Sequence, residues 1–130
     1  MVNSIGKWKI YALETGTFRL DGGAMMGSVP KVLWEKTNPP DKMNRIELSL
    51  RCLLADDGKN KVLIDTGIGN KINLDFINMF NIIQTQNPIE QNLLELGYNM
   101  EDINHVILTH LHFDHAGGVT VFNNDGDIIP

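Results

Sequence analysis

The four histidines of this 130-residue chain all fall within eleven consecutive residues. His110, His112 and His115 share a run of six residues with Asp114, and His105 lies just upstream. Neutral imidazole is the commonest metal ligand in proteins, and a carboxylate is a suitable hard partner for it. Donors at this spacing can reach one small volume, so the run predicts a transition-metal site.

The residues before the run predict the strand that would position it. Residues 106–108 (Val-Ile-Leu) form a short apolar segment typical of a buried strand, and polar residues begin where it ends. Side chains two residues apart in extended backbone point the same way, so His110 and His112 should face one ion. By the same alternation, Leu111 and Phe113 should pack behind them.

Two glycines follow the run and predict a close turn of the backbone around the site. Gly117 and Gly118 allow such an approach. We also expect a helix to begin here, with Asp114 or His115 in its first turn. His105 lies an odd number of residues before the first of the three clustered histidines. We therefore expect it to point away, as a structural or solvated residue.

The composition favours one globular domain that acts on small molecules. With 42% apolar and 21% charged residues, the chain can bury a real core. The net charge is −5 and the 11 lysines and arginines are scattered, which argues against a nucleic-acid surface. The chain has no run of eighteen apolar residues, and its first residues lack the apolar core of a signal peptide. We therefore expect a cytoplasmic protein without a membrane span.

The single cysteine, Cys52, cannot form an internal disulfide. It lies in segment 46–54, where every second residue is apolar. A small core residue is the favoured interpretation, and a reactive thiol is the alternative.

Strand and helix patterns alternate and predict an α/β fold with a mixed sheet covered on at least one face. Strands are expected at 8–13, 16–20, 46–54 and 61–65, with a loop at 21–28 and a hairpin turn at 56–60. Helical segments are expected at 30–36, at 71–81, and from the cap residue Asn87 to the terminator Gly97. In the last of these, Leu93, Leu94 and Leu96 should form the buried face.

Two motifs resemble those of a known family, the metallo-β-lactamase-fold hydrolases. The first is His110-x-His112-x-Asp114-His115 followed by Ala116-Gly117-Gly118, and the second is the upstream run 61–67, a strand that ends in Asp65-Thr66-Gly67. The opening, residues 18–34, is similar to the branch that includes the quorum-quenching lactonases. The resemblance implies that residues 1–130 are a single domain and the truncated amino-terminal part of that fold. This part would be half of an αββα sandwich, a mixed sheet with helices on one face.

The resemblance also implies a role for each residue of the motifs. His110 and His112 would bind a first metal ion, and Asp114 and His115 a second, with zinc the leading choice and iron or manganese also suited to these ligands. A hydroxide shared between the ions would attack the carbonyl of an ester, lactone, thioester or amide, and Asp114 would orient it or pass a proton to the leaving group. Asp65 at a strand end is often only a turn former, but here it would orient the ligands from behind.

Members of this family are longer, and they add a further histidine, a bridging aspartate and a last histidine beyond the region that matches this chain. Two ligands for each ion fall short of the three usual at a catalytic zinc, so we expect the chain alone to bind metal weakly or not at all. Three hypotheses follow. The chain is part of a larger hydrolase, or a complementing chain or second copy completes its site, or it is a non-catalytic module.

Overall fold

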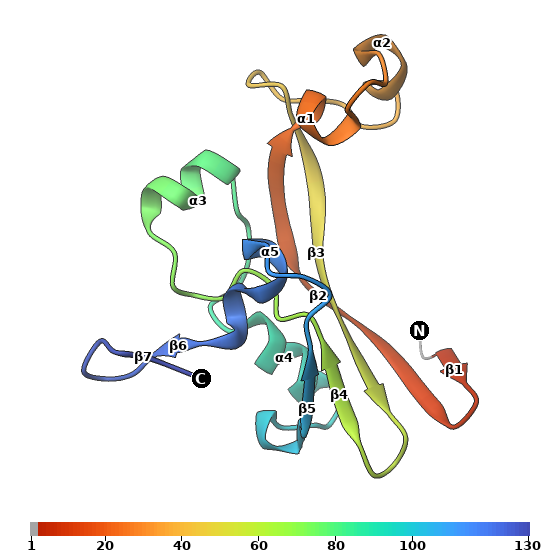
Figure 1. Ribbon diagram of the computed structural model, residues 1–130, viewed down its shortest axis with the longest axis vertical. Coiled ribbons are helices and arrows are strands. Elements are labelled where there is room, and N and C mark those ends of the chain that lie inside the picture. The colour runs from red at the N-terminus through yellow and green to blue at the C-terminus, as the bar shows by residue number, and fades with distance from the viewer. Residues whose placement is uncertain (1–2) are drawn as a thin grey trace.

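The computed structural model describes residues 3–130, which form a five-stranded sheet, a separate two-stranded hairpin and several short helices (Figure 1). The sheet order is β1-β2-β3-β4-β5. Its strands are β1 (Asn3–Ile5), β2 (Trp8–Asp21), β3 (Arg45–Asp56), β4 (Lys61–Ile64) and β5 (His105–Ile107). Neighbouring strands from β1 to β4 are antiparallel, whereas β4 and β5 are parallel, so the predicted mixed sheet is confirmed.

Short helices connect and flank these strands. They are α1 (Gly22–Met26), α2 (Lys31–Trp34), α3 (Leu74–Phe80), α4 (Pro88–Glu95) and α5 (Phe113–Ala116), with 3₁₀ turns η1 (Met100–Asp102) and η2 (Gly117–Val119). The hairpin of β6 (Val121–Phe122) and β7 (Ile128–Ile129) follows η2 and projects away from the main sheet (Figure 1). No helix within residues 3–130 has the length and apolar character needed to cross a membrane.

The prediction of two separate strands at 8–13 and 16–20 is wrong, because β2 is continuous. Its pairing with β3 shifts register between Glu14 and Gly16 and then resumes. Gly16 has φ +141°, and a Cβ there would lie 2.3 Å from the carbonyl oxygen of Ile83. The glycine thus forms a bulge that leaves room for the segment containing Ile83. Hydrogen bonding to β3 continues on both sides of the bulge and keeps the strand intact.

The predicted loop at 21–28 contains a helix, α1. The Asp21 carboxylate accepts a hydrogen bond from the Ala24 N–H at 2.7 Å and another from the Asn44 side chain at 3.0 Å. The first bond caps the helix. The second bond comes from Asn44, which is distant in sequence. Local periodicity therefore did not reveal this support for the helix. The predicted helical turn at 30–36 is confirmed as α2.

One core cluster lies between the sheet and α4. It contains Leu13, Cys52, Leu54, Leu63 and Leu93. Cys52 is 2% exposed, as the core interpretation requires, and burial raises the pKa of its thiol to about 11. A thiol with that pKa stays protonated at neutral pH and is a poor nucleophile.

In α4 only part of the predicted buried face is correct. Leu93 is fully buried, but Leu94 and Leu96 are 55% and 37% exposed. Ile89 and Leu93 are four residues apart and share one face of the helix, whereas Leu94 lies about 100° further around it. The predicted start is correct because Pro88 is the first helical residue.

The predicted burial of the strand before the metal motif is wrong. Val106 and Ile107 in β5 are 52% and 53% exposed. β5 is the last strand of the sheet and pairs only with β4 among the described strands. An apolar strand therefore stands at an open sheet edge.

Candidate metal centre

The parallel pair β4 and β5 brings two distant parts of the sequence to the same edge of the sheet. Asp65 follows β4, and its N–H donates to the carbonyl oxygen of Ile107 at 2.8 Å, which extends the pairing beyond the strands. The histidine motif begins at His110, three residues after the end of β5. Because the carboxyl ends of parallel strands meet, Asp65 lies beside a motif that is more than forty residues away in sequence.

All four predicted metal ligands lie close together. His110 Nε2 is 2.9 Å from His112 Nδ1, and the ring centroids of His110 and His115 are 4.0 Å apart. His115 Nε2 is 3.2 Å from Asp114 Oδ2. The predicted pairing of His110 with His112 on one side of the loop is therefore consistent with the geometry.

The cluster is compact but not arranged around an ion. Within residues 3–130, no three His, Cys, Asp or Glu side chains are placed to bind one metal ion together. Two imidazole ligands of one tetrahedral zinc, with bonds of about 2.0–2.1 Å, would have their nitrogens about 3.3–3.4 Å apart. His110 and His112 are a few tenths of an ångström closer than that and contact each other instead. Their chemistry fits a metal ion, and a small separation of the rings would admit one.

Asp65 supports the histidine cluster through hydrogen bonds to Thr109 and His115. Its carboxylate accepts hydrogen bonds from the Thr109 N–H at 2.8 Å, from the Thr109 hydroxyl at 2.9 Å and from His115 Nδ1 at 2.8 Å. Burial pushes the pKa of Asp65 upward, but the hydrogen bonds from His115 and Thr109 outweigh this effect, and the pKa lies below its ordinary value. An ionised carboxylate only accepts, so Nδ1 of His115 carries a proton and Nε2 is the nitrogen left to bind a ligand.

The turn after β4 also supports the backbone of the motif. The Thr66 N–H and hydroxyl both donate to the carbonyl oxygen of His115, at 2.7 and 3.0 Å. A Cβ on Gly117 would lie 2.0 Å from the Ile68 carbonyl oxygen, and one on Gly118 would lie 2.3 Å from that of Thr66. The predicted close approach at these glycines is confirmed, and Asp114 lies in the first turn of α5 as expected.

Sequence reasoning missed three residues that support the motif, namely Thr66, Gly69 and Thr109. Gly69 has φ +72°, and a Cβ there would lie 2.6 Å from the carbonyl oxygen of Gly117. The glycine two residues after Asp-Thr-Gly was a local signal for such a turn. The contact of Thr109 with Asp65 had no local signal, because it depends on the pairing of β4 with β5.

The apolar residues of the motif behave differently from each other. Phe113 packs as predicted, with ring centroids 5.8, 5.1 and 5.0 Å from those of Phe18, Phe76 and Phe80. Leu111 is 80% exposed, so its predicted packing is wrong. The chain has left the sheet at Leu111, and the cluster around Phe113 does not extend to it. His105 is exposed, as expected.

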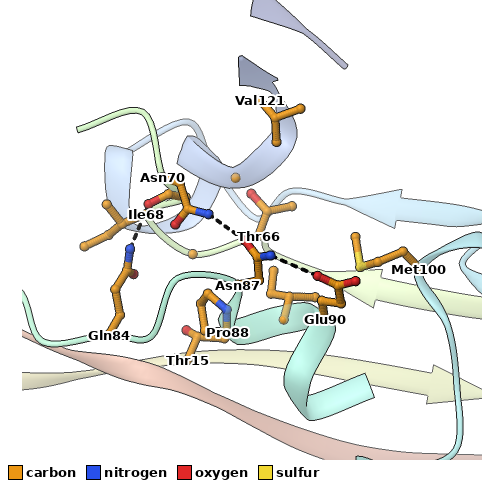
Figure 2. A pocket seen from close by; sticks show the side chains of 14 residues that line it. Thr15, Thr66, Ile68, Asn70, Gln84, Asn87, Pro88, Glu90, Met100 and Val121 are labelled. Carbon is orange, nitrogen blue, oxygen red and sulfur yellow. Dashed lines mark hydrogen bonds between the residues drawn. The ribbon is translucent and has the colours of Figure 1, made fainter. Parts of the chain in front are cut away.

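Two cavities adjoin the turn that supports the motif. One, of about 280 Å³, lies between this turn and α4, and its rim carries a chain of hydrogen bonds from Asn70 through Asn87 to Glu90 (Figure 2). None of the four predicted metal ligands lines it. The other, of about 290 Å³, is lined by Lys71, Phe113 and residues of α3, and it lies beside the motif.

Comparison with known proteins identifies the family. Residues 48–129 match the family described as the metallo-beta-lactamase superfamily. The chain belongs to this superfamily. A probable metallo-hydrolase of Mycobacterium tuberculosis is 32% identical over 117 residues, which cover 76% of this chain and 36% of that relative. An N-acyl homoserine lactonase of Bacillus thuringiensis is 26% identical over 131 residues, which cover 93% of this chain and 48% of that protein.

Solved structures agree with the metallo-beta-lactamase assignment. The crystal structure of a probable metal-dependent hydrolase from Staphylococcus aureus has a TM-score of 0.85 and 35% identity, over 92% of this chain and 43% of that one. A dizinc quorum-quenching lactonase has a TM-score of 0.68 at 21% identity, over 98% of this chain and 40% of that one, a likeness of fold alone. The predicted family and α/β fold are confirmed. The chain spans about a third to a half of the length of the relatives it matches.

Proposed function

We propose that this chain is the amino-terminal part of a metal-dependent hydrolase that cleaves a small ester, lactone, thioester or amide. Membership of the metallo-beta-lactamase superfamily supports this reaction class. The observation that carries the proposal is the convergence of His110, His112, Asp114 and His115 at the carboxyl end of β5, with Asp65 behind them. On this proposal residues 1–130 act as one domain, and the substrate is a small molecule.

The donor set fits two divalent ions. His110 and His112 would hold one, and Asp114 and His115 the other, with zinc the leading candidate and iron or manganese as alternatives. When bound, such ions supply Lewis-acid polarisation of a carbonyl and lower the pKa of water from about 15.7 to about 7. The lactonase-like relatives favour a lactone among the candidate substrates.

The side chains of this chain would perform the remaining tasks. Asp65 keeps a proton on Nδ1 of His115, which leaves Nε2 free to bind. Asp114 carries its carboxylate next to that nitrogen and would orient the attacking group or hold a proton for the leaving group. Thr109 fixes Asp65 through its N–H and its hydroxyl.

Completion of the site requires donors beyond these four, since a catalytic zinc usually has three protein ligands. A longer polypeptide, a complementing chain or a second copy of this chain would supply them. One observation favours the alternative of a non-catalytic module: no three donors among residues 3–130 converge on one ion. The cytoplasmic location stays a prediction.

Metal content and assembly state test the proposal together. The chain is purified without chelator, its zinc, iron and manganese are measured by elemental analysis, and its mass in solution is measured by light scattering. We expect weak metal binding or none by the chain alone, and tighter binding in any assembly that contributes further ligands. Hydrolysis is then assayed with N-acyl homoserine lactones and simple aryl esters.

Alanine variants assign the metal to the motif. His110→Ala and Asp114→Ala should each lose metal and any hydrolysis. His105→Ala is the matched control, since His105 is exposed and its ring forms a hydrogen bond to its neighbour Asn104. Metal retained by both motif variants would remove these residues from the site. A chain that binds no metal in any assembly would favour the non-catalytic alternative.

A further inference from the structure

Lys71 joins the turn after β4 to the end of the histidine motif. Its ammonium group donates hydrogen bonds to the carbonyl oxygens of Gly117 and Thr120, which are 46 and 49 residues away in sequence. Gly117 is the first residue of η2 and Thr120 directly follows it. The two bonds therefore hold both ends of the short segment that leaves the motif.

These carbonyl groups are the partners that offset the charge of Lys71. The side chain is half-buried, and no carboxylate oxygen within residues 3–130 lies within 4.0 Å of its ammonium nitrogen. Partial burial of an ammonium group is costly unless polar groups satisfy it. Two backbone carbonyls at the end of a helical turn provide such groups, and a lysine placed there also interacts favourably with the helix dipole.

The hydrogen bonds of Lys71 support the backbone after His115 and not the part of the motif that holds His110 and His112. The backbone of His115 is held by Thr66, and the residues just after it are held by Lys71. His110 and His112 come before α5, and the lysine does not contact them. Loss of the ammonium group would loosen the segment on the His115 side, which the Gly118 N–H still joins to the carbonyl oxygen of Gly67 at 3.2 Å, and leave the other two imidazoles in place.

We propose that Lys71 is a positioning residue that sets the affinity of the ion bound by Asp114 and His115. This inference rests on the proposed function, because it takes these two residues as ligands. Lys71 is not one of the four predicted ligands. It acts through the backbone of residues 115–120, which it fixes against the turn that also carries Asp65.

The first test is a titration of the metal-free chain with Co²⁺, followed by visible absorption, which reports each coordination environment. Lys71→Met removes the ammonium group and keeps an unbranched chain, Lys71→Arg keeps a cationic donor, and Lys42→Met is the control, since Lys42 is exposed. We expect Lys71→Met to weaken the Co²⁺ site of Asp114 and His115 by about 10-fold to 100-fold, the usual effect of losing a residue that orients ligands. The other site should be unchanged, and Lys71→Arg should restore most of the loss.

The second test needs no metal. Hydrogen exchange of backbone amides in residues 115–120 should be faster in Lys71→Met than in the parent, and normal in Lys71→Arg and Lys42→Met. If Lys71→Met fails to fold, Lys71→Gln takes its place, because the shorter amide cannot serve both carbonyl groups.

The outcomes separate this inference from the proposed function. Equal weakening of both Co²⁺ sites, or a loss that Lys71→Arg does not restore, would overturn the positioning role. Exchange in residues 115–120 that matches Lys42→Met would also overturn it. If the chain binds no Co²⁺ in any assembly, the proposed function fails, whereas the exchange experiment still decides whether Lys71 holds the segment.

Discussion

At the scale of single residues, the site depends on a carboxylate that is not itself a predicted ligand. Asp65 has a 10% exposed side chain and accepts hydrogen bonds from Thr109 and His115. It connects the end of β4 to both ends of the histidine motif. A bond to a charged acceptor is stronger than one between neutral groups, so this one side chain contributes to the stability of the chain as well as to the geometry of the site.

Asp65→Asn should destabilise the chain, by an amount that depends on pH. The pKa of Asp65 lies below its ordinary value in the folded chain, so the ionised form stabilises the fold. This contribution is fully present above the unfolded pKa of about 3.9 and is lost as the pH falls through the folded value. Losing hydrogen bonds to a charged group costs about 1.5–3 kcal/mol, so a difference of that order is expected near pH 7.

Urea unfolding of Asp65→Asn and the parent, from neutral pH to about pH 3, measures this difference. The gap in the free energy of unfolding should narrow below about pH 4. Asp125→Asn is the control, since Asp125 is exposed and its carboxylate makes no hydrogen bond or ion pair in the described structure. A gap that stays constant down to acid pH would mean that Asp65 acts through its shape and not its charge.

Sequence reasoning located Asp65 and expected it to orient the ligands, but it missed the partner Thr109. The Asp-Thr-Gly turn after an apolar strand indicated where the residue lies. Its bond to Thr109 spans 44 residues and exists only because β4 and β5 are parallel neighbours. Three histidines close in sequence, His110, His112 and His115, predicted their own contact, whereas Lys71 reaches the motif through tertiary structure alone.

At the scale of elements, α3 is joined to the motif through aromatic packing. Phe113 of α5 contacts Phe76 and Phe80 of α3, and also Phe18 of β2. Periodicity predicted this helix at 71–81, and the structure has it shorter, from Leu74 to Phe80, because Asn73 caps its start and accepts from the Phe76 N–H. The pattern indicated a helix, and its capping residue determined where it begins.

Phe113→Ala should destabilise the chain and loosen α3. Removal of a phenylalanine ring from a well-packed cluster costs about 3–5 kcal/mol, and the half-buried position of Phe113 favours the lower end. Urea unfolding measures the loss, and limited proteolysis should show faster cleavage within 74–80. Phe122→Ala deletes the same atoms from a 54% exposed residue of β6 and should change stability by about 0.5 kcal/mol or less. Equal losses of stability in the two variants would contradict specific packing between α3 and the motif.

At the scale of the whole chain, one face of the sheet is covered and the other presents an apolar row. Leu63 and Leu93 pack together on the α4 side. On the opposite side, register places Ala12, Leu53, Ile64 and Ile107 directly across four strands. The motif allowed the family and the α/β layout to be predicted, but the burial expected for β5 presumed a covering layer that residues 3–130 do not supply. Periodicity shows which residues are apolar and does not show what covers them.

Zinc should stabilise the whole chain, because an ion that binds only the folded state shifts the unfolding equilibrium. At a free concentration about 100 times the dissociation constant, the gain is about 2.7 kcal/mol. Binding must part His110 from His112, whose nitrogens are 2.9 Å apart, and it requires deprotonated imidazoles. Thermal unfolding with and without zinc measures this stabilisation, and a chelator should reverse it.

Mg²⁺ prefers oxygen ligands and should leave the unfolding temperature unchanged. An equal shift with Mg²⁺ would indicate binding to surface carboxylates and not to the imidazole cluster.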